Sequence, residues 1–201
     1  TTRPETMLGD TAVAVNPKDK RYKNLVSKNV ILPIVEKKIK IIADDYADPE
    51  QGTGAVKITP AHDFNDYEVG IRNKLEIINI FTEDGKINEN APSAYVGLDR
   101  FEARKKIISE LKNKNLFVKD EDIRNKVPYG DRSNSIIEPY LTEQWFADAK
   151  KLSNKAKKIV RSKKTKFFPT NWSKTYFQWM DNIEPWCVSR QLWWGHQIPA
   201  W

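Results

Sequence analysis

Two short segments of the chain combine residue types that could bind a small polar ligand. The first, GTGAVKITPAHDFNDY at residues 52–67, contains one lysine, several hydroxyls and carboxylates. If residues 55–59 form a strand, alternation places Lys57 and Thr59 on one face, opposite the apolar side chains. Asp63 would then cap a helix that follows the strand. The polar strand face and the helix entrance would meet around one volume, suited to a zwitterionic or amino-bearing ligand.

A purely structural explanation is available for the same residues. Asp63 and Asp66 have the spacing of an N-cap and a third helical residue, where carboxylates stabilise a helix without further function. Gly52 and Gly54 would only shape a turn, and His62 would only hydrogen-bond to backbone. Spacing alone leaves both explanations open.

The second segment is TTRPET at residues 1–6. Its hydroxyls, beside Arg3 and Glu5, would suit a site that handles a ribose or an ester. The alternative is a polar loop that leads into a strand at residues 11–15.

The sequence contains few of the residues and motifs that other kinds of catalytic site require. The chain has two histidines, His62 and His196, and no G-x-S-x-G elbow, phosphate-binding loop or G-x-G-x-x-G fingerprint. The one cysteine, Cys187, follows Trp186 in an apolar setting that favours inert packing. A single cysteine also excludes an internal disulfide framework and a Cys-based zinc site.

Apolar periodicity predicts a mixed chain. Strands are expected at 11–15, 30–35, 39–43, 55–59 and 76–81, and helices at 19–27, 64–74, 98–113, 148–161 and 172–183. Further strand-like pieces are expected between residues 116 and 141. Because helices interrupt the strands irregularly, we predict a mixed α+β fold with a β-barrel-like core and peripheral helices. A helical, aromatic-rich connecting segment is expected after a boundary near residue 145.

Charge and tryptophan are concentrated in the second half. The net charge of the chain is +7, but residues 1–100 carry 14 Lys and Arg against 16 Asp and Glu, whereas residues 101–201 carry 20 against 11. A face with this excess would attract a polyanion such as RNA, and a solvated lysine-rich helix is the alternative. All seven tryptophans lie between Trp145 and Trp201, so this part must pack on something large.

The composition sets outer limits. The chain has 201 residues, a mass of 23.3 kDa and a mean hydropathy of −0.67. No apolar run approaches the roughly 20 residues that cross a bilayer, and no secretory signal is recognisable at the start. We therefore expect a cytoplasmic protein without membrane contact. The absence of an initial Met and the aromatic end suggest a piece of a longer protein.

Together, the motifs resemble those of one family. TTRPET at 1–6 resembles the threonine-rich peptide of the editing domain in the class I aminoacyl-tRNA synthetases for valine, isoleucine and leucine. GTGAV with PAH and Asp66, within 52–66, resembles the second motif of that domain. The tail WCVSRQLWWGHQIPAW at 186–201 is similar to the point where the editing insertion returns to the synthetic domain.

Within this family, the valine enzymes are the most similar. The similarity is carried by Lys57, by the pair Asp63 and Asp66, and by WWGH at 193–196. The resemblance implies an editing core over residues 1–144 and a connecting segment that leads back to the synthetic domain. The ATP- and Mg-binding signatures of the synthetic domain are missing, so no cofactor is expected in this chain.

The resemblance also implies a reaction, hydrolysis of the ester in threonyl-tRNA(Val). A hydrophobic synthetic site rejects the isosteric threonine poorly, for which valine enzymes are the standard example, so a second and polar pocket is needed. The implied partners are tRNA(Val) misacylated with threonine and the rest of the synthetase in cis, in a monomer. A positioned water is expected to attack the ester, with neither a covalent nucleophile nor a metal.

The family motifs assign roles to individual residues. Asp66 is implied to bind the substrate α-ammonium, and Arg3 with its threonine neighbours to contact the terminal adenosine and the ester. Lys57 and Thr59, with Asp63, fit the threonine hydroxyl. The residues expected to take part in catalysis are Asp66, Thr2 and Asp63. The residues expected to bind substrate are Arg3, Thr1, Glu5, Thr6, Lys57, Thr59, His62, Gly52, Thr53 and Gly54.

Two features depart from the family pattern. Gln51 is polar where some relatives place an aromatic lid, and residues 127–133 lack the cysteines of a zinc knuckle that some synthetases carry. Two other functions stay open beside threonyl-tRNA(Val) hydrolysis. The chain could be an RNA-binding insertion that hydrolyses nothing, or a hydrolase for another misacylated amino acid.

Overall fold

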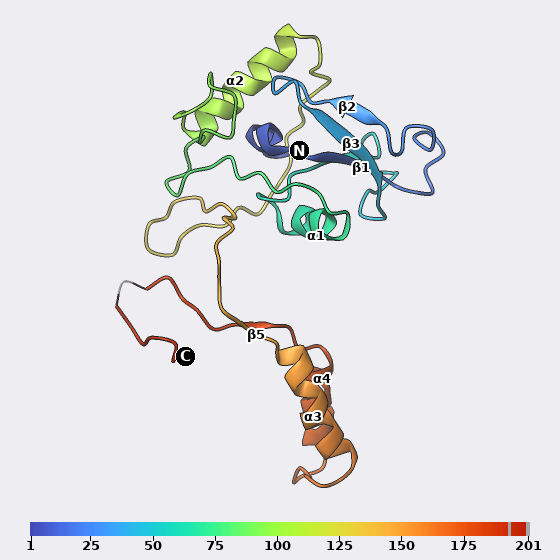
Figure 1. Cartoon of the computed structure of the whole chain (residues 1–201), viewed down its shortest axis with the longest axis vertical. Helices are drawn as coiled ribbons and strands as arrows, with labels where there is room; N and C mark the ends of the chain where they lie inside the picture. The colour runs from blue at the N-terminus through green and yellow to red at the C-terminus, as the bar shows by residue number, and fades with distance from the viewer. Residues whose placement is uncertain (193, 200–201) are drawn as a thin grey trace. The chain divides into compact units, whose positions relative to one another are not determined.

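The computed structural model describes residues 1–192 and 194–199, and the chain divides into two compact units (Figure 1). Unit 1 is Thr1–Leu141 and unit 2 is Thr142–Trp201. Of the tail motif at 186–201, residues 193, 200 and 201 lie outside the described part. The functional assignment of residues 1–144 and 145–201 stays a prediction.

Unit 1 is built around one four-stranded sheet. Its strands are β1 (Ala12–Val15), β2 (Asn29–Ile31), β3 (Lys38–Ala43) and β4 (Ala55–Ile58), in the order β2-β3-β1-β4. β1 runs parallel to β3 and antiparallel to β4, with Ala12 opposite Ile58 and Val13 opposite Lys57. The central strand β1 therefore brings the segment before it, at the end of the threonine-rich peptide, against the end of β4.

Three helices accompany the sheet in unit 1: the 3₁₀ helix η1 (Pro4–Gly9), α1 (Phe64–Arg72) and α2 (Arg100–Asn113). Each α-helix starts at an aspartate N-cap. Asp63 Oδ1 accepts from the backbone N–H of Asn65 at 2.9 Å, and Asp99 Oδ1 accepts from that of Phe101 at 2.8 Å. These two caps fix where α1 and α2 begin.

Unit 1 has two apolar clusters. One joins α1 to the sheet through Val69, which packs with Ile58 of β4 and with small residues of β1. The other joins α2 to η1 through Ile107 and Leu8, with Phe81 from the intervening chain. The threonine-rich peptide and β4 are thus each held by a buried core, which positions the polar residues between them.

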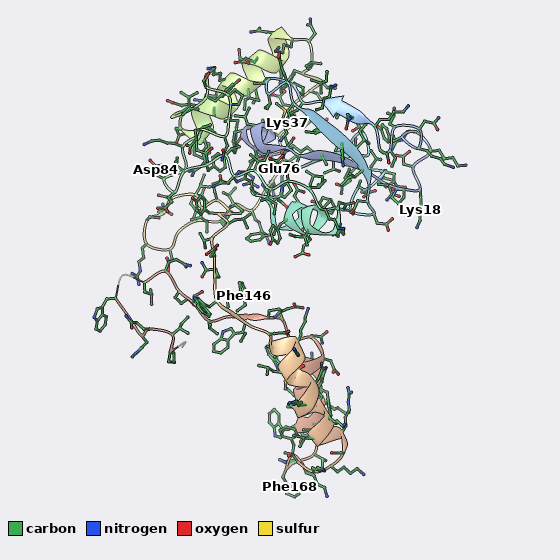
Figure 2. The ribbon with its side chains drawn as sticks, in the orientation of Figure 1. Lys18, Lys37, Glu76, Asp84, Phe146 and Phe168 are labelled. Atoms are coloured by element: carbon green, nitrogen blue, oxygen red, sulfur yellow. The ribbon has the colours of Figure 1, made fainter. Side chains whose placement is uncertain are left out.

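Unit 2 is a helical hairpin with a small ribbon. It contains β5 (Phe146–Ala147), α3 (Ala149–Arg161), α4 (Trp172–Asp181) and β6 (Trp186–Cys187), with β5 and β6 paired antiparallel. Asp181 of α4 lies 3.1 Å from Lys157 Nζ of α3, which ties the two helices together. Aromatic side chains remain exposed, including Phe146 and the Phe168 side chain near the helical turn (Figure 2).

A mixed α/β fold is confirmed, but a barrel is not. Among the described residues the four-stranded sheet stays open, with β2 and β4 at its edges. The strand expected at 76–81 does not form, because the Ile80 N–H donates to His62 Nε2 and the Phe81 N–H to Asn79 Oδ1 instead of to a neighbouring strand. The aromatic-rich connecting segment is likewise not confirmed as such.

Two other expected elements are shorter or absent for local reasons. The strand expected at 30–35 ends at Ile31, because Pro33 has no N–H to donate and Ile34 has a φ of 70°. Residues 19–27 form turns rather than a helix. There, Asp19 accepts from the backbone N–H and the guanidinium of Arg21, a local arrangement that competes with helix.

Candidate active site

A polar cavity of about 510 Å³ lies in unit 1. It is lined by Thr1, Thr2, Arg3, Thr6, Tyr46, Gln51, Gly52, Thr53, Ala55, Val56, Lys57, Thr59, Asp63 and Asp66. Three segments supply nearly all of the lining: the N-terminal peptide, the turn before β4 with β4 itself, and the start of α1. Ten of the thirteen residues expected to act in catalysis or binding are among them.

Lys57 supplies the ammonium group of this cavity. Because side chains alternate along a strand, Lys57 lies on the same face as Thr59, while Ile58 points into the core. The Lys57 ammonium donates to Thr59 Oγ1. Lys57 Nζ also donates to Thr6 Oγ1 at 2.9 Å and to Asp10 Oδ1 at 3.2 Å. The ammonium therefore joins the threonine-rich peptide to β4.

The start of α1 supplies two carboxylates. Asp63 Oδ1 accepts from the N–H of Asn65 and, at 3.2 Å, from that of Asp66, so Asp63 is the N-cap that the structural explanation expects. Asp66 is 5% exposed, and its Oδ2 accepts from the Thr59 N–H at 2.9 Å. Burial raises the pKa of Asp66, and the Thr59 N–H and Lys57 partly oppose this rise. A buried carboxylate of this kind would bind an ammonium group strongly.

Arg3 holds the N-terminal peptide against α1. Its guanidinium donates to the carbonyl oxygen of His62 and to Glu138, and lies 3.9 Å from Asp63 Oδ2. Its backbone N–H donates to Thr1 Oγ1 at 3.2 Å. Arg3 thus has structural partners as well as a place in the cavity lining.

Three expected site residues lie outside the cavity lining. Glu5 is fully buried and accepts from Arg104 through both carboxylate oxygens, at 2.6 and 2.7 Å. His62 is fully buried, and its Nε2 accepts from the Ile80 N–H at 3.0 Å. Gly54 has a φ of 77°, and a Cβ there would lie 2.6 Å from an Arg21 nitrogen, so it shapes the turn before β4.

Two residues next to the expected site residues, Tyr46 and Asp10, were not predicted from the sequence. Tyr46 lines the cavity from the loop after β3, and Asp10 accepts from Lys57 and Thr59 just behind it. Asp10 precedes β1, so it could have been found only by knowing that β1 pairs antiparallel with β4. No local spacing signals Tyr46.

Within residues 1–192 and 194–199 no group of three or more His, Cys, Asp or Glu side chains is arranged to hold a metal ion. Among those same residues, no helix has the length and apolar character needed to span a membrane.

Comparison with known proteins identifies the class of protein to which the chain belongs. The family model of the class I tRNA synthetases (I, L, M and V) matches residues 2–201, and the chain belongs to this family. Over 201 residues it is 82% identical to the valine–tRNA ligase of Pelagibacter ubique (strain HTCC1062), covering all of this chain and 23% of that protein.

Other valine–tRNA ligases are also similar along the whole chain. The enzyme of Caulobacter vibrioides (strain ATCC 19089 / CIP 103742 / CB 15) is 60% identical and that of Coxiella burnetii (strain RSA 493 / Nine Mile phase I) 56%, each over 100% of this chain and 22% of the relative. The chain thus spans less than a quarter of the length of these relatives.

Among solved structures, one match is the crystal structure of the ternary complex of Agrobacterium radiobacter K84 agnB2 LeuRS-tRNA-LeuAMS. It is 20% identical, with a TM-score of 0.43, over 57% of this chain and 16% of that chain.

Proposed function

We propose that this chain is the editing domain of a valine–tRNA ligase and that its cavity hydrolyses the ester of threonyl-tRNA(Val). One observation carries the proposal: an ammonium, five threonines and two carboxylates line one cavity in a chain similar to valine–tRNA ligases. Such a lining suits an amino acid that bears a hydroxyl and an α-ammonium.

The polar wall around Lys57 would select threonine against valine. Lys57, Thr6 and Thr59 form a connected set of hydrogen-bonding groups in the lining. Threonine's hydroxyl can join this set, whereas the methyl group of valine would desolvate it without replacing the lost hydrogen bonds to water. An unsatisfied buried polar group costs about 1–3 kcal/mol, which corresponds to a selectivity of roughly 5- to 150-fold.

The start of α1 would hold the other end of the amino acid. Asp66 would pair with the α-ammonium, which fixes the ester near Thr2 and Asp63 at the cavity wall. A water held between these polar groups and the free ribose hydroxyl of the terminal adenosine would attack the ester carbonyl. Arg3 and the Thr1–Thr2 region would contact that adenosine.

The proposal includes the setting of the reaction. Residues 1–144 form the editing core and 145–201 the connecting segment, and the ATP- and Mg-dependent aminoacylation takes place in the rest of the ligase. The partners are tRNA(Val) and that remainder in the same chain, in a monomeric cytoplasmic enzyme. Support comes from the similar proteins, which are valine–tRNA ligases.

The test is a deacylation assay on a full-length enzyme. The chain replaces the matching region of the Pelagibacter ubique ligase, to which it is 82% identical. We expect hydrolysis of threonyl-tRNA(Val), and a roughly 100-fold lower kcat/KM in Asp66→Asn, because a charge-assisted hydrogen bond is worth about 1.5–3 kcal/mol. The control is Asp44→Asn, a buried carboxylate paired with Arg72 outside the cavity. Equal activity of Asp66→Asn and Asp44→Asn would contradict the proposal.

A second candidate, an RNA-binding insertion without hydrolysis, is favoured by the exposed lysines Lys151, Lys155 and Lys158 along α3. It predicts tRNA binding that weakens steeply with salt, and no deacylation. Hydrolysis of threonyl-tRNA(Val) by the wild-type enzyme, lost in Asp66→Asn, decides against it.

A further inference from the structure

Asp10 lies just behind the cavity. It is 2% exposed and is absent from the cavity lining. The antiparallel pairing of β1 with β4 places it there, because the Thr11 N–H donates to the Ile58 carbonyl at 3.0 Å and brings the preceding residue against Thr59. Its Oδ1 accepts from both Thr59 Oγ1 and Lys57 Nζ.

The lysine ammonium has no donor left for a ligand in this arrangement. An ammonium carries three N–H groups and no acceptor. Lys57 donates them to Thr6 Oγ1, Asp10 Oδ1 and Thr59 Oγ1. In the described structure all three donors are therefore used within the protein.

The two hydroxyls beside Lys57, those of Thr6 and Thr59, both donate their protons to acceptors within the protein. The Thr59 hydroxyl donates its proton to Asp10, and the Thr6 hydroxyl donates to the Arg3 carbonyl oxygen at 3.0 Å. Each hydroxyl also accepts from Lys57, and a hydroxyl has two lone pairs. One lone pair on each oxygen remains, so this part of the cavity offers acceptors and no donor.

We infer that Asp10 is a positioning residue that fixes the direction of the Thr59 and Lys57 hydrogen bonds, so that the hydroxyl oxygens of Thr6 and Thr59 recognise a ligand group only if it donates a proton. The inference rests on the proposed function and deepens it: the threonine hydroxyl is read as a donor. An ester whose side chain offers only an acceptor, such as O-methylthreonine, is then a poor substrate for an electronic reason as well as a steric one.

The charge state of Asp10 supports this orientation at neutral pH. Burial raises its pKa to about 6, Lys57 and Thr59 oppose the rise, and Asp66 adds to it. Above that pKa the group is a carboxylate, which can only accept. Thr59 must then be the donor in their mutual hydrogen bond.

The experiment compares two substrates in the full-length chimera at pH 7.5. The substrates are tRNA(Val) charged with threonine and tRNA(Val) charged with O-methylthreonine, and the readout is the ratio of their kcat/KM values. Asp10→Ala frees the Thr59 proton and one Lys57 donor to turn toward the ether oxygen. The ratio is expected to fall about tenfold, the equivalent of one net hydrogen bond. Because wild type and variant are given the same O-methylthreonine substrate, the steric effect of its extra methyl group cancels when their two ratios are compared.

Two further variants distinguish a change in hydrogen-bond direction from a general disruption of the structure. Asp10→Asn retains an oxygen that accepts from Thr59 and Lys57, so its ratio should return to near the wild-type value. Asp10→Leu also lacks an acceptor but leaves no cavity, so its ratio should fall like that of Asp10→Ala. Asp44→Asn, which alters a buried carboxylate paired with Arg72, should leave the ratio unchanged.

The outcomes distinguish this inference from the proposed function. If the wild type hydrolyses threonyl-tRNA(Val) and the ratio stays constant in Asp10→Ala and Asp10→Leu, Asp10 does not set direction and the inference alone is wrong. If the wild type hydrolyses neither substrate, the proposed function fails and the inference with it. Loss of folding in both variants, checked by urea unfolding, would make Asp10 a structural residue and also overturn the inference.

Discussion

Replacing His62 by glutamine should make the free energy of unfolding depend on pH more strongly than in the wild type, where an opposite effect nearly cancels that of His62. His62 is fully buried, and burial, with Arg3 and Lys57 nearby, lowers its pKa to about 4. The unfolded chain, with a histidine pKa of 6.5, binds the proton more tightly, so His62 destabilises the fold as pH falls from about 6.5 toward 4. Glutamine offers an Oε1 acceptor to the Ile80 N–H in place of Nε2.

Asp10 acts in the opposite direction over nearly the same range. Its pKa is raised from 3.8 to about 6, so the folded state binds the proton more tightly and gains stability as pH falls through 6 toward 4. Between pH 7 and pH 4, linkage gives a loss of about 3 kcal/mol from His62 and a gain of about 2 kcal/mol from Asp10. The two effects nearly cancel in the wild type.

The assay is urea unfolding of the chain at several pH values between 7 and 4. From His62 and Asp10 together, the free energy of unfolding of the wild type should change by less than about 1 kcal/mol. That of His62→Gln should rise by about 2 kcal/mol, and that of Asp10→Asn should fall by about 3 kcal/mol. Parallel pH profiles for all three proteins would refute the reasoning, because neither group would then titrate differently in the folded and unfolded states.

Three other predictions concern stability and are checked by urea unfolding. Asp44→Ala should cost about 2 kcal/mol at pH 7, since Arg72 holds the pKa of Asp44 at about 2, and the difference from wild type should vanish as pH falls through 3.8 toward 2; a pH-independent difference would contradict this. Glu5→Ala should cost about 3–5 kcal/mol, because it leaves Arg104 without its buried partner; a loss below about 1 kcal/mol would show that the pair is not structural. Ile58→Ala should cost about 2–5 kcal/mol by opening a cavity between the sheet and α1, and a negligible loss would place Ile58 outside the core.

Much of the local structure could be predicted from the sequence, because the signals are local. The α1 boundary follows from Asp63 as N-cap, and the two faces of β4 follow from alternation, which places Lys57 and Thr59 together. The α3 and α4 helices also appear close to their expected positions, as Ala149–Arg161 and Trp172–Asp181.

The rest depended on long-range contacts that no spacing reveals. Closure of the sheet into a barrel was expected, but residues 76–81 bind His62 and their own side chains instead of a strand. Glu5 was expected in the site, yet its partner Arg104 lies 99 residues away in α2 and holds it in the core. Asp10 was overlooked because its contact with Thr59 requires the pairing of β1 with β4.

The central claim is tested most directly by the relative rates at which the full-length chimera hydrolyses threonyl-tRNA(Val) and valyl-tRNA(Val). The polar wall of Lys57, Thr6 and Thr59 predicts that the threonyl ester is lost at least about tenfold faster, because valine has no group that can donate to the open lone pairs of the Thr6 and Thr59 hydroxyls. Equal rates for the two esters, or no hydrolysis of either by a folded enzyme, would contradict the account.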